Sequence, residues 1–331
     1  MTKVEASNTE LAEAVRNALP VIDKILGADG RDLPSRPMAA TTLFVEQFII
    51  DVRGGSKEKP YLQEWFAIIF AIVAGWYEAK YGAALKTKSG ILLGVVQIHN
   101  LPFKVRVPPT YAAPHASGEL SDLCFGPSLG ERETPLKWID SPPALESLTT
   151  RQSNRLDRDL RSLTKLLRST NLNFMLGDPA PEQYKQFRAV TLGSIRKAAE
   201  HIVSGGEGDY ASAAWEIHYA VENAVKALIA QAGAQPDLEH GLSHLVKQAQ
   251  SVGVMLNGTK NIEFLPSART AIKYRYGKPL PGGYRAAFAM YQKALPLLAD
   301  FSSTVKRSLV LGDGATITLR KPPWFQFLED E

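Results

Sequence analysis

Residues 209–233 read DYASAAWEIHYAVENAVKALIAQAG and carry the strongest helical pattern in the chain. We predict Asp209 as the N-cap of this helix and Gly233 as the left-handed residue that ends it. The helix has so wide an apolar face that other helices must cover it, so the stretch predicts a helical bundle. The apolar residues recur at steps of three and four, the spacing of one helix face: Ala214, Ile217, Val221, Ala224, Val225, Leu228 and Ile229.

Other segments can supply the remaining helices of such a bundle. Residues 182–204, 242–250 and 284–305 show helical spacing of apolar side chains. Within the central stretch, Glu222 and Lys226 stand four residues apart with the acid first, the order that favours a helix. A bundle over about residues 179–310 therefore follows from the pattern.

Three short motifs in this region occur in a fixed order. Residues 222–228 read ENAVKAL, residues 240–245 read HGLSHL, and residues 274–277 read YRYG ahead of YRAA at 284–287. They resemble the E-x-A-x-K-A-L, H-x-L-x-x-L and R-Y-P/G patterns of the HEPN domain, an all-helical bundle of prokaryotic defence and toxin–antitoxin proteins. The resemblance covers residues 182–306 and implies a bundle that forms homodimers. It does not extend to residues 1–150.

RNA-cleaving HEPN proteins carry an R-x4-6-H motif near the start of the last helical segment. The arginine would stabilise charge on the phosphate, and the histidine would act on the 2′-hydroxyl. The corresponding run here is RTAIKYRY at residues 269–276, with Tyr274 in place of the histidine. No histidine follows His244, and a tyrosine with a pKa near 10 is a poor base at neutral pH. The resemblance thus implies a degenerate motif, with Arg269, Tyr274 and Tyr276 as candidate catalytic residues.

Two alternatives to this interpretation stay open. Arg269 and Arg275 could hold carboxylates of the bundle while the tyrosines pack, as structural ion pairs often do. The motif could also serve an active, metal-independent ribonuclease with a divergent site. A second match to the pattern, Arg196 with His201, falls on the first bundle helix and so lies in the wrong place.

Residues 151–170 form a second clear amphipathic helix, with leucines on one face and basic side chains on a neighbouring one. A basic row can contact phosphate oxygens, and each such contact adds salt-sensitive affinity. The alternative is a solvated helix face partly paired with Asp157 and Asp159. The candidate nucleic-acid-binding residues are Arg151, Arg155, Arg158, Arg161, Lys165, Arg168 and, in the degenerate motif, Arg275.

Composition excludes several functional classes. The net charge of +4 permits RNA binding without requiring it, and the single cysteine, Cys124, excludes an intramolecular disulfide. Residues 65–77, WFAIIFAIVAGWY, are shorter than the ~20 residues that span a bilayer. His240 and His244 have the spacing of metal ligands but lack a third ligand, so we expect no metal and no cofactor. We expect a cytoplasmic protein without membrane contact.

The N-terminal half shows a mixture of helical, strand and irregular patterns. We predict helices over residues 7–26, begun by a capping box at Ser7 and Glu10, and over 60–81, while residues 41–52 fit a helix or a strand. Residues 91–98 and 103–107 read as strands of a small antiparallel sheet packed on these helices. Residues 108–143 are rich in proline and glycine and read as irregular chain, and 315–319 as a short strand.

The predicted fold class is α+β and mostly helical, with N-terminal helices and a small antiparallel sheet before a HEPN-like antiparallel helical bundle. The expected domains are an α+β domain at 1–145, a basic connecting helix at 146–178, the bundle at 179–310, and a strand with an aromatic tail at 311–331. We expect a HEPN-like protein that binds RNA, a nucleotide or a protein partner in prokaryotic defence or toxin–antitoxin biology. An active ribonuclease is the alternative.

Overall fold

The computed structural model describes residues 2–52, 57–85, 91–114, 120–237, 241–256, 259–307 and 315–320. The chain divides into two compact units. The first consists chiefly of Met1–Ser89, and the second of Gly90–Ala116 and Ser121–Thr318. The predicted boundary at residue 145 falls inside the second unit.

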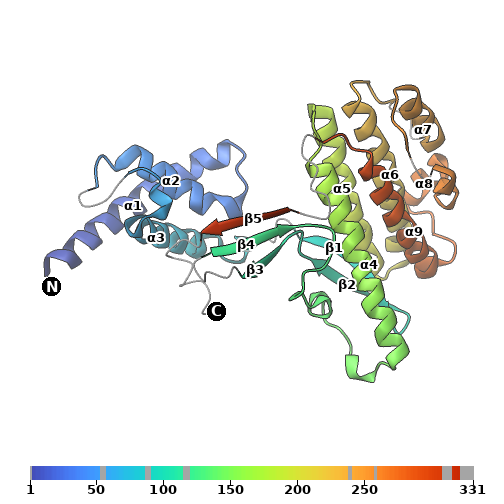
Figure 1. Cartoon of the computed structure of the whole chain (residues 1–331), viewed down its shortest axis with the longest axis horizontal. Coiled ribbons are helices and arrows are strands. Elements are labelled where there is room, and N and C mark those ends of the chain that lie inside the picture. Colours follow the sequence, from blue (N-terminus) through green and yellow to red (C-terminus); the bar gives the residue numbers. More distant parts are fainter. Residues whose placement is uncertain are drawn as a thin grey trace. The chain divides into compact units, whose positions relative to one another are not determined.

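In the part of the first unit that the structure describes, the α-helices are α1 (Thr2–Ala28), α2 (Arg36–Phe48) and α3 (Glu64–Tyr81) (Figure 1). They bury a shared apolar core that includes Leu19, Phe44 and Val73. The helix α1 begins at Thr2, so the predicted start at the Ser7 capping box is wrong. Residues 41–52, which the sequence left open, lie mostly within α2.

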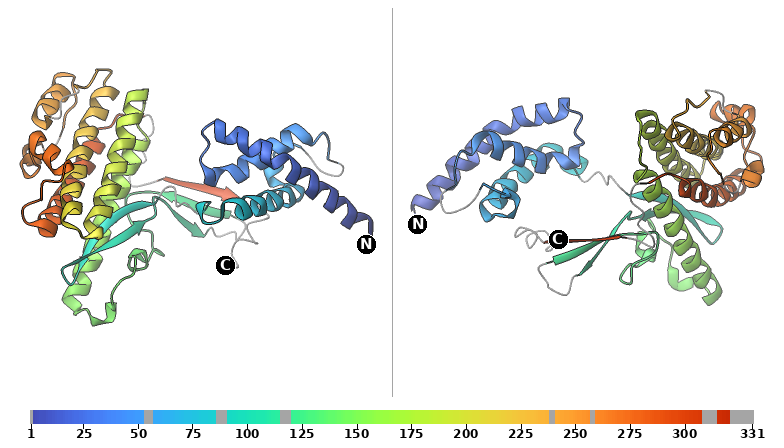
Figure 2. Two further views of the ribbon diagram at one scale, coloured as in Figure 1. Left: turned by 180° about the vertical axis from the view of Figure 1, so that it is seen from behind. Right: turned by 45° about the horizontal axis from the view of Figure 1, so that its top comes forward.

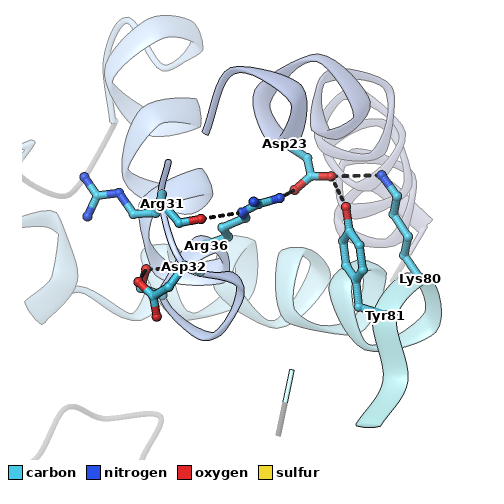
Figure 3. Close-up of polar contacts among 7 residues, drawn as sticks. Asp23, Arg31, Asp32, Arg36, Lys80 and Tyr81 are labelled. Atoms are coloured by element: carbon cyan, nitrogen blue, oxygen red, sulfur yellow. Dashed lines mark hydrogen bonds and ion pairs between the residues drawn. The ribbon is translucent and has the colours of Figure 1, made fainter. Parts of the chain in front are cut away.

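A buried carboxylate joins the three helices of this unit (Figure 3). Asp23 of α1 is 4% exposed and accepts hydrogen bonds from Arg36 Nη1 at 3.2 Å and Lys80 Nζ at 2.9 Å. The Tyr81 hydroxyl also donates to it. Burial alone would raise the pKa of Asp23, but the donors outweigh it and lower the pKa to about 2. Asp23 is therefore a charged anchor between α1, α2 and α3.

The second unit opens with a two-stranded hairpin, β1 (Leu92–Ile98) and β2 (Leu101–Val107), paired antiparallel from Leu92–Val107 to Ile98–Leu101. We expected the hairpin to share a core with the N-terminal helices. Its buried side chains instead belong to the core of the second unit, and β1 packs on the helices α4 and α5 (Figure 2). At Gly94 the approach is so close that an added Cβ would lie 2.7 Å from Leu163 Cδ2.

The proline-rich stretch after the hairpin is more regular than the sequence suggests. Strands β3 (Tyr111–Pro114) and β4 (Leu120–Phe125) pair antiparallel, and β5 (Ala315–Arg320) adds to β4 as the third strand. Thr316 donates to Cys124 Sγ, and Thr318 donates to Asp122 at 2.7 Å. The expectation of wholly irregular chain over 108–143 is therefore wrong, whereas the strand expected near 315–319 is present.

The helix α4 (Thr150–Met175) begins with a capping box formed by Thr149 and Gln152. We expected this segment to connect two domains. Its leucine face, including Leu160 and Leu167, is instead buried in the same core as the hairpin and the bundle, and α4 packs on α9. It is thus an integral helix of the second unit.

The bundle consists of α5 (Glu182–Ser204), α6 (Glu207–Gln231), α7 (Leu242–Ser251), α8 (Ala268–Arg275) and α9 (Gly283–Ser303). The helix α6 lies at the centre, with α5 on one side and α7 and α8 on the other (Figure 1). The predicted fold class is confirmed: helices predominate, and a small antiparallel hairpin accompanies a C-terminal helical region. In the part of the chain that the structure describes, no helix has both the length and the apolar character to cross a bilayer.

Candidate functional site

The central helix α6 sets the position of the candidate site. Its N-cap is Gly206, whose N–H donates to Asp209, so Asp209 lies in the first turn and is not the N-cap that we predicted. At the other end, Gly233 has a φ of +85° as predicted. Ala234 N–H donates to the Ile229 carbonyl group there, which closes the helix in a Schellman arrangement.

A row of polar side chains runs along the buried side of α6. Lys226 Nζ lies 2.7 Å from Glu222 Oε1, and His218 Nε2 lies 3.8 Å from the other oxygen of Glu222. Glu222 is 0% exposed and Lys226 is 6% exposed. The predicted pairing of Glu222 with Lys226 is present, but these groups lie inside the bundle, where a polymeric ligand cannot reach them. The row therefore specifies the packing of α6.

One turn before this row, Trp215 forms the contact between α6 and α8. Its ring stacks on Tyr219 with centroids 5.1 Å apart, and the Arg275 guanidinium lies 5.2 Å from the Trp215 ring centre. Such cation–π contacts orient a guanidinium without neutralising it. The contact with Trp215 orients the Arg275 guanidinium. Because Arg275 is also exposed, its charge remains available to a ligand.

The helix α8 presents two different faces. Ser267 caps it by accepting from Thr270 N–H, and Ala271 and Tyr274 turn inward, with Tyr274 only 8% exposed. Its outward side chains define what we call the α8 basic face: Arg269, Lys273, Tyr276, Lys278 and the adjoining Arg275, all of them exposed.

The end of α8 holds the last residues of this face in place. Gly277 has a φ of +90°, and Lys278 N–H donates to the Lys273 carbonyl group at 2.9 Å. This arrangement brings Lys278 back beside Lys273. Tyr276, at the C-cap, is 77% exposed. The face therefore combines several cations with one open aromatic ring.

The structure separates the candidate catalytic residues. Arg269 and Tyr274 are five residues apart on a helix, which turns their side chains about 140° from each other. Arg269 is accordingly exposed, while Tyr274 is packed in the bundle. Tyr276 is exposed on the α8 basic face, as Arg269 is. Within the described part of the chain, no carboxylate forms an ion pair with Arg269 or Arg275, so the alternative of two structural ion pairs gains no support.

The basic row of α4 is only partly a solvent-facing row. Arg151, Arg155, Arg158, Arg161 and Lys165 are exposed. Two of them pair along the helix, Arg161 with Asp157 at 2.7 Å and Arg155 with Asp159 at 3.7 Å. These pairs fit the alternative of a partly paired solvated face.

Arg168, the last member of the row, is buried. It is 2% exposed and holds Glu133 through two bonds, of 2.8 Å from Nη1 and 2.6 Å from Nη2. Its Nε donates to the Pro108 carbonyl group, and Nη1 also donates to the Ser128 carbonyl group. The ring centres of Tyr111 and Trp138 each lie 5.6 Å from the guanidinium. Arg168 therefore fastens the 108–138 segment to α4 and is not available to nucleic acid.

The two other motifs that the sequence suggested, the His240–His244 pair and the Arg196–His201 match, give weaker support for a functional site. His244 contacts Asp237, while His240 lies outside the described residues. Among the described residues, no group of three or more side chains is arranged to hold a metal ion. Arg196 pairs with Glu200 at 3.1 Å, and His201 pairs with Asp209 at 3.1 Å. The two residues of the second R-x4-H match therefore have different partners.

Sequence reasoning missed Lys273, Lys278 and Trp215. Lys273 could have been found from its i, i+4 spacing to Arg269, which places both on one helix face. The position of Lys278 depends on the turn at Gly277. The position of Trp215 depends on the packing of α6 against α8, two helices that α7 separates in the sequence. Local spacing carries no signal for such contacts.

These residues define a helical bundle. Its central helix is capped at both ends and holds the buried Glu222–Lys226 pair, and its helix α8 is basic. The family model of the HEPN domain matches residues 195–296, from α5 through α6, α7 and α8 into α9. These residues of the C-terminal half are therefore similar to the HEPN domain, as the motifs predicted. Comparisons with curated proteins and with solved structures returned no match.

Proposed function

We propose that this protein binds single-stranded RNA through the α8 basic face and cleaves it very slowly or not at all. The HEPN domain favours a function that involves RNA or nucleotides. The α8 basic face supplies charge for phosphates, and Tyr276 supplies an open ring on which a base can stack, a contact worth about 1–3 kcal/mol. This combination is typical of a surface for single strands.

One observation supports binding without turnover: Arg269 and Tyr274 point away from each other. Cleavage by the 2′-hydroxyl needs one group to take a proton and another to give one. Arginine and lysine side chains stabilise phosphate charge, but arginine cannot shuttle protons near pH 7. His218, whose ring centre lies 6.5 Å from that of Trp215, is 1% exposed and cannot reach a bound strand.

Charge reversal on α8 tests the binding site. Arg269→Glu with Lys273→Glu should weaken binding of a fluorescent single-stranded RNA strongly and flatten its salt dependence, by about 0.7 in the log–log slope per lost contact. Fluorescence anisotropy at several salt concentrations measures both quantities. The matched control is Lys185→Glu with Lys247→Glu, which changes the net charge equally on α5 and α7.

The two pairs of substitutions give different results only if α8 is the contact surface. If the control pair weakens binding as much as the α8 pair, the attraction is general and the assignment to α8 fails. Replacing Arg155, Arg158 and Lys165 with glutamate tests the α4 row in the same assay. Loss of binding in that variant alone would place the RNA on α4.

The absence of turnover has its own test. We expect the unaltered protein to leave RNA intact over hours in the absence of metal, because Tyr274, which stands where the motif has its histidine, is packed inside the bundle. Robust cleavage that Arg269→Ala abolishes would contradict the proposal and favour the divergent ribonuclease. The substitution Tyr274→His places an imidazole on the inward face, so we expect it to restore little activity.

The wider setting rests on the HEPN resemblance. We propose a role in prokaryotic defence or toxin–antitoxin biology, and a homodimer formed through the bundle. Sedimentation equilibrium of the full chain measures the second point directly. A mass that stays at 36.3 kDa across the micromolar range would contradict dimerisation.

A further inference from the structure

An apolar cavity lies within the second unit, away from the α8 basic face. It has a volume of about 820 Å³, and it is formed by the start of β1, the residues Pro109, Thr110 and Phe125, and the helices α4 and α5. Cavities of about 300–1,000 Å³ are the size that small-molecule ligands occupy in proteins. The residues of α4 that line it include Leu167, Asn171 and Met175, which share one face at helical spacing.

Two glycines, Gly94 on β1 and Gly193 on α5, lie at or near the walls of the cavity. Just beyond the cavity, at Gly94, β1 approaches α4 closely, as described above, whereas Ile91, Leu92 and Leu93 line the opening before that contact. On α5, Gly193 forms part of the wall, and no atom lies within 4 Å of the place where its Cβ would stand. A glycine inside a helix costs stability relative to alanine. Its presence here leaves room in the cavity at the expense of the helix.

The polar side chains that line the cavity are few: Thr110, Thr170, Asn171 and Arg196. Thr170 is buried, whereas the Arg196 side chain is 58% exposed and Met175, which also lines the cavity, is 52% exposed. The guanidinium is paired with Glu200 at 3.1 Å, an exposed i, i+4 pair of the kind that contributes little and that an incoming anion can replace. The cavity is therefore apolar inside, with a cation at its edge.

We propose that this cavity binds a small amphipathic anion, with its apolar body against β1, α4 and α5 and its acidic head group at Arg196. An apolar cavity of this size does not hold water well, since water needs polar partners. The open space at Gly193 leaves room for a hydrocarbon body, and a carboxylate or sulfonate matches the charge of Arg196. This site shares no residue with the α8 basic face.

The probe for the test is 8-anilino-1-naphthalenesulfonate, an aromatic sulfonate that fluoresces in apolar sites. The full chain should bind it saturably with a stoichiometry of one, and decanoate should displace it. Gly193→Phe should lower its affinity at least tenfold by filling the cavity. Gly193→Ala is the matched control, because it adds one methyl group in open space and should keep the affinity within about twofold.

A second comparison tests the head group. In displacement of the same probe, decanoate should compete better than 1-decanol, and Arg196→Ala should remove most of that advantage while leaving decanol unchanged. Thermal unfolding by circular dichroism shows that each variant is folded. Equal probe binding by the unaltered protein and Gly193→Phe, probe that decanoate does not displace, or equal competition by decanoate and decanol would overturn the proposal.

Discussion

Arg168 shows how little the position of a side chain in a helical row says about its environment. It follows Lys165 at a spacing of three residues, so the sequence places it on the same solvent-facing row as Arg161. The covering segment that buries it comes from residues 108–138, far away in sequence. Spacing along a helix gives the direction of a side chain and carries no information about a loop that covers it.

We predict that Arg168→Met lowers the free energy of unfolding by about 3–5 kcal/mol, because it leaves the Glu133 carboxylate buried without its partner. Urea unfolding followed by circular dichroism measures the change. The double substitution Arg168→Met with Glu133→Gln removes both charges and should recover part of the loss. If the double variant is no more stable than the single one, the ion pair is not the source of the effect.

Asp23 makes the stability of the first unit depend on pH. Its pKa is about 2 in the folded protein and 3.8 when unperturbed, so the unfolded chain takes up the proton first as the pH falls. The stabilisation is complete above pH 4 and is lost as the pH falls from 4 to 2, with a size on the order of 2 kcal/mol. Replacing Asp23 with asparagine should remove this contribution.

The measurement compares unfolding free energies of the protein and its Asp23→Asn variant at pH 6, 4 and 3. The difference between the two should be largest at pH 6 and should shrink at pH 3. Other carboxylates titrate in both proteins and cancel in the comparison. A difference that stays constant over this range would mean that Asp23 contributes by packing and not by charge.

At the scale of elements, local pattern predicts what local interactions determine. The helix α6 was found from its own apolar spacing, and β1 and β2 from β-branched and alternating residues, because those signals lie within each segment. The pairing of β4 with β5 joins residues 192 positions apart, and β3 and β4 are only 4 and 6 residues long. No periodicity within either strand could reveal that sheet.

The turn of the β1–β2 hairpin is a further prediction at this scale. His99 and Asn100 have φ values of +50° and +64°, the left-handed conformations of a two-residue type I′ turn. A histidine there is strained, so replacing the pair with Asn-Gly should stabilise the protein by about 1 kcal/mol. Urea unfolding measures it, with His99→Val as the destabilising counterpart. A loss of stability in the Asn-Gly variant would show that His99 has a contact worth more than the strain.

For the whole molecule, the burial pattern predicts which fragments fold. The hairpin, α4 and the bundle share one core, so a fragment over residues 90–320 should unfold cooperatively at nearly the temperature of its own region in the full chain. A fragment over 179–310 lacks α4 and the hairpin and should be markedly less stable, because removing them exposes apolar faces of α5 and α9. Calorimetry of both fragments measures the difference, and equal stability would show that α4 and β1 contribute little.

The pairing of β5 with β4 also has a consequence for the order of folding. Cys124 and Thr316 make contact across 192 residues, and that interval contains every helix of the bundle. Closing so long a loop is slow unless the intervening chain is already compact. During synthesis, the hairpin and the helices α4 to α9 can assemble as they leave the ribosome, whereas the three-stranded sheet has to wait until residue 320 has been made. We therefore expect β4 to spend the period of translation with one edge unpaired, which is the time when this chain is most open to capture by a chaperone.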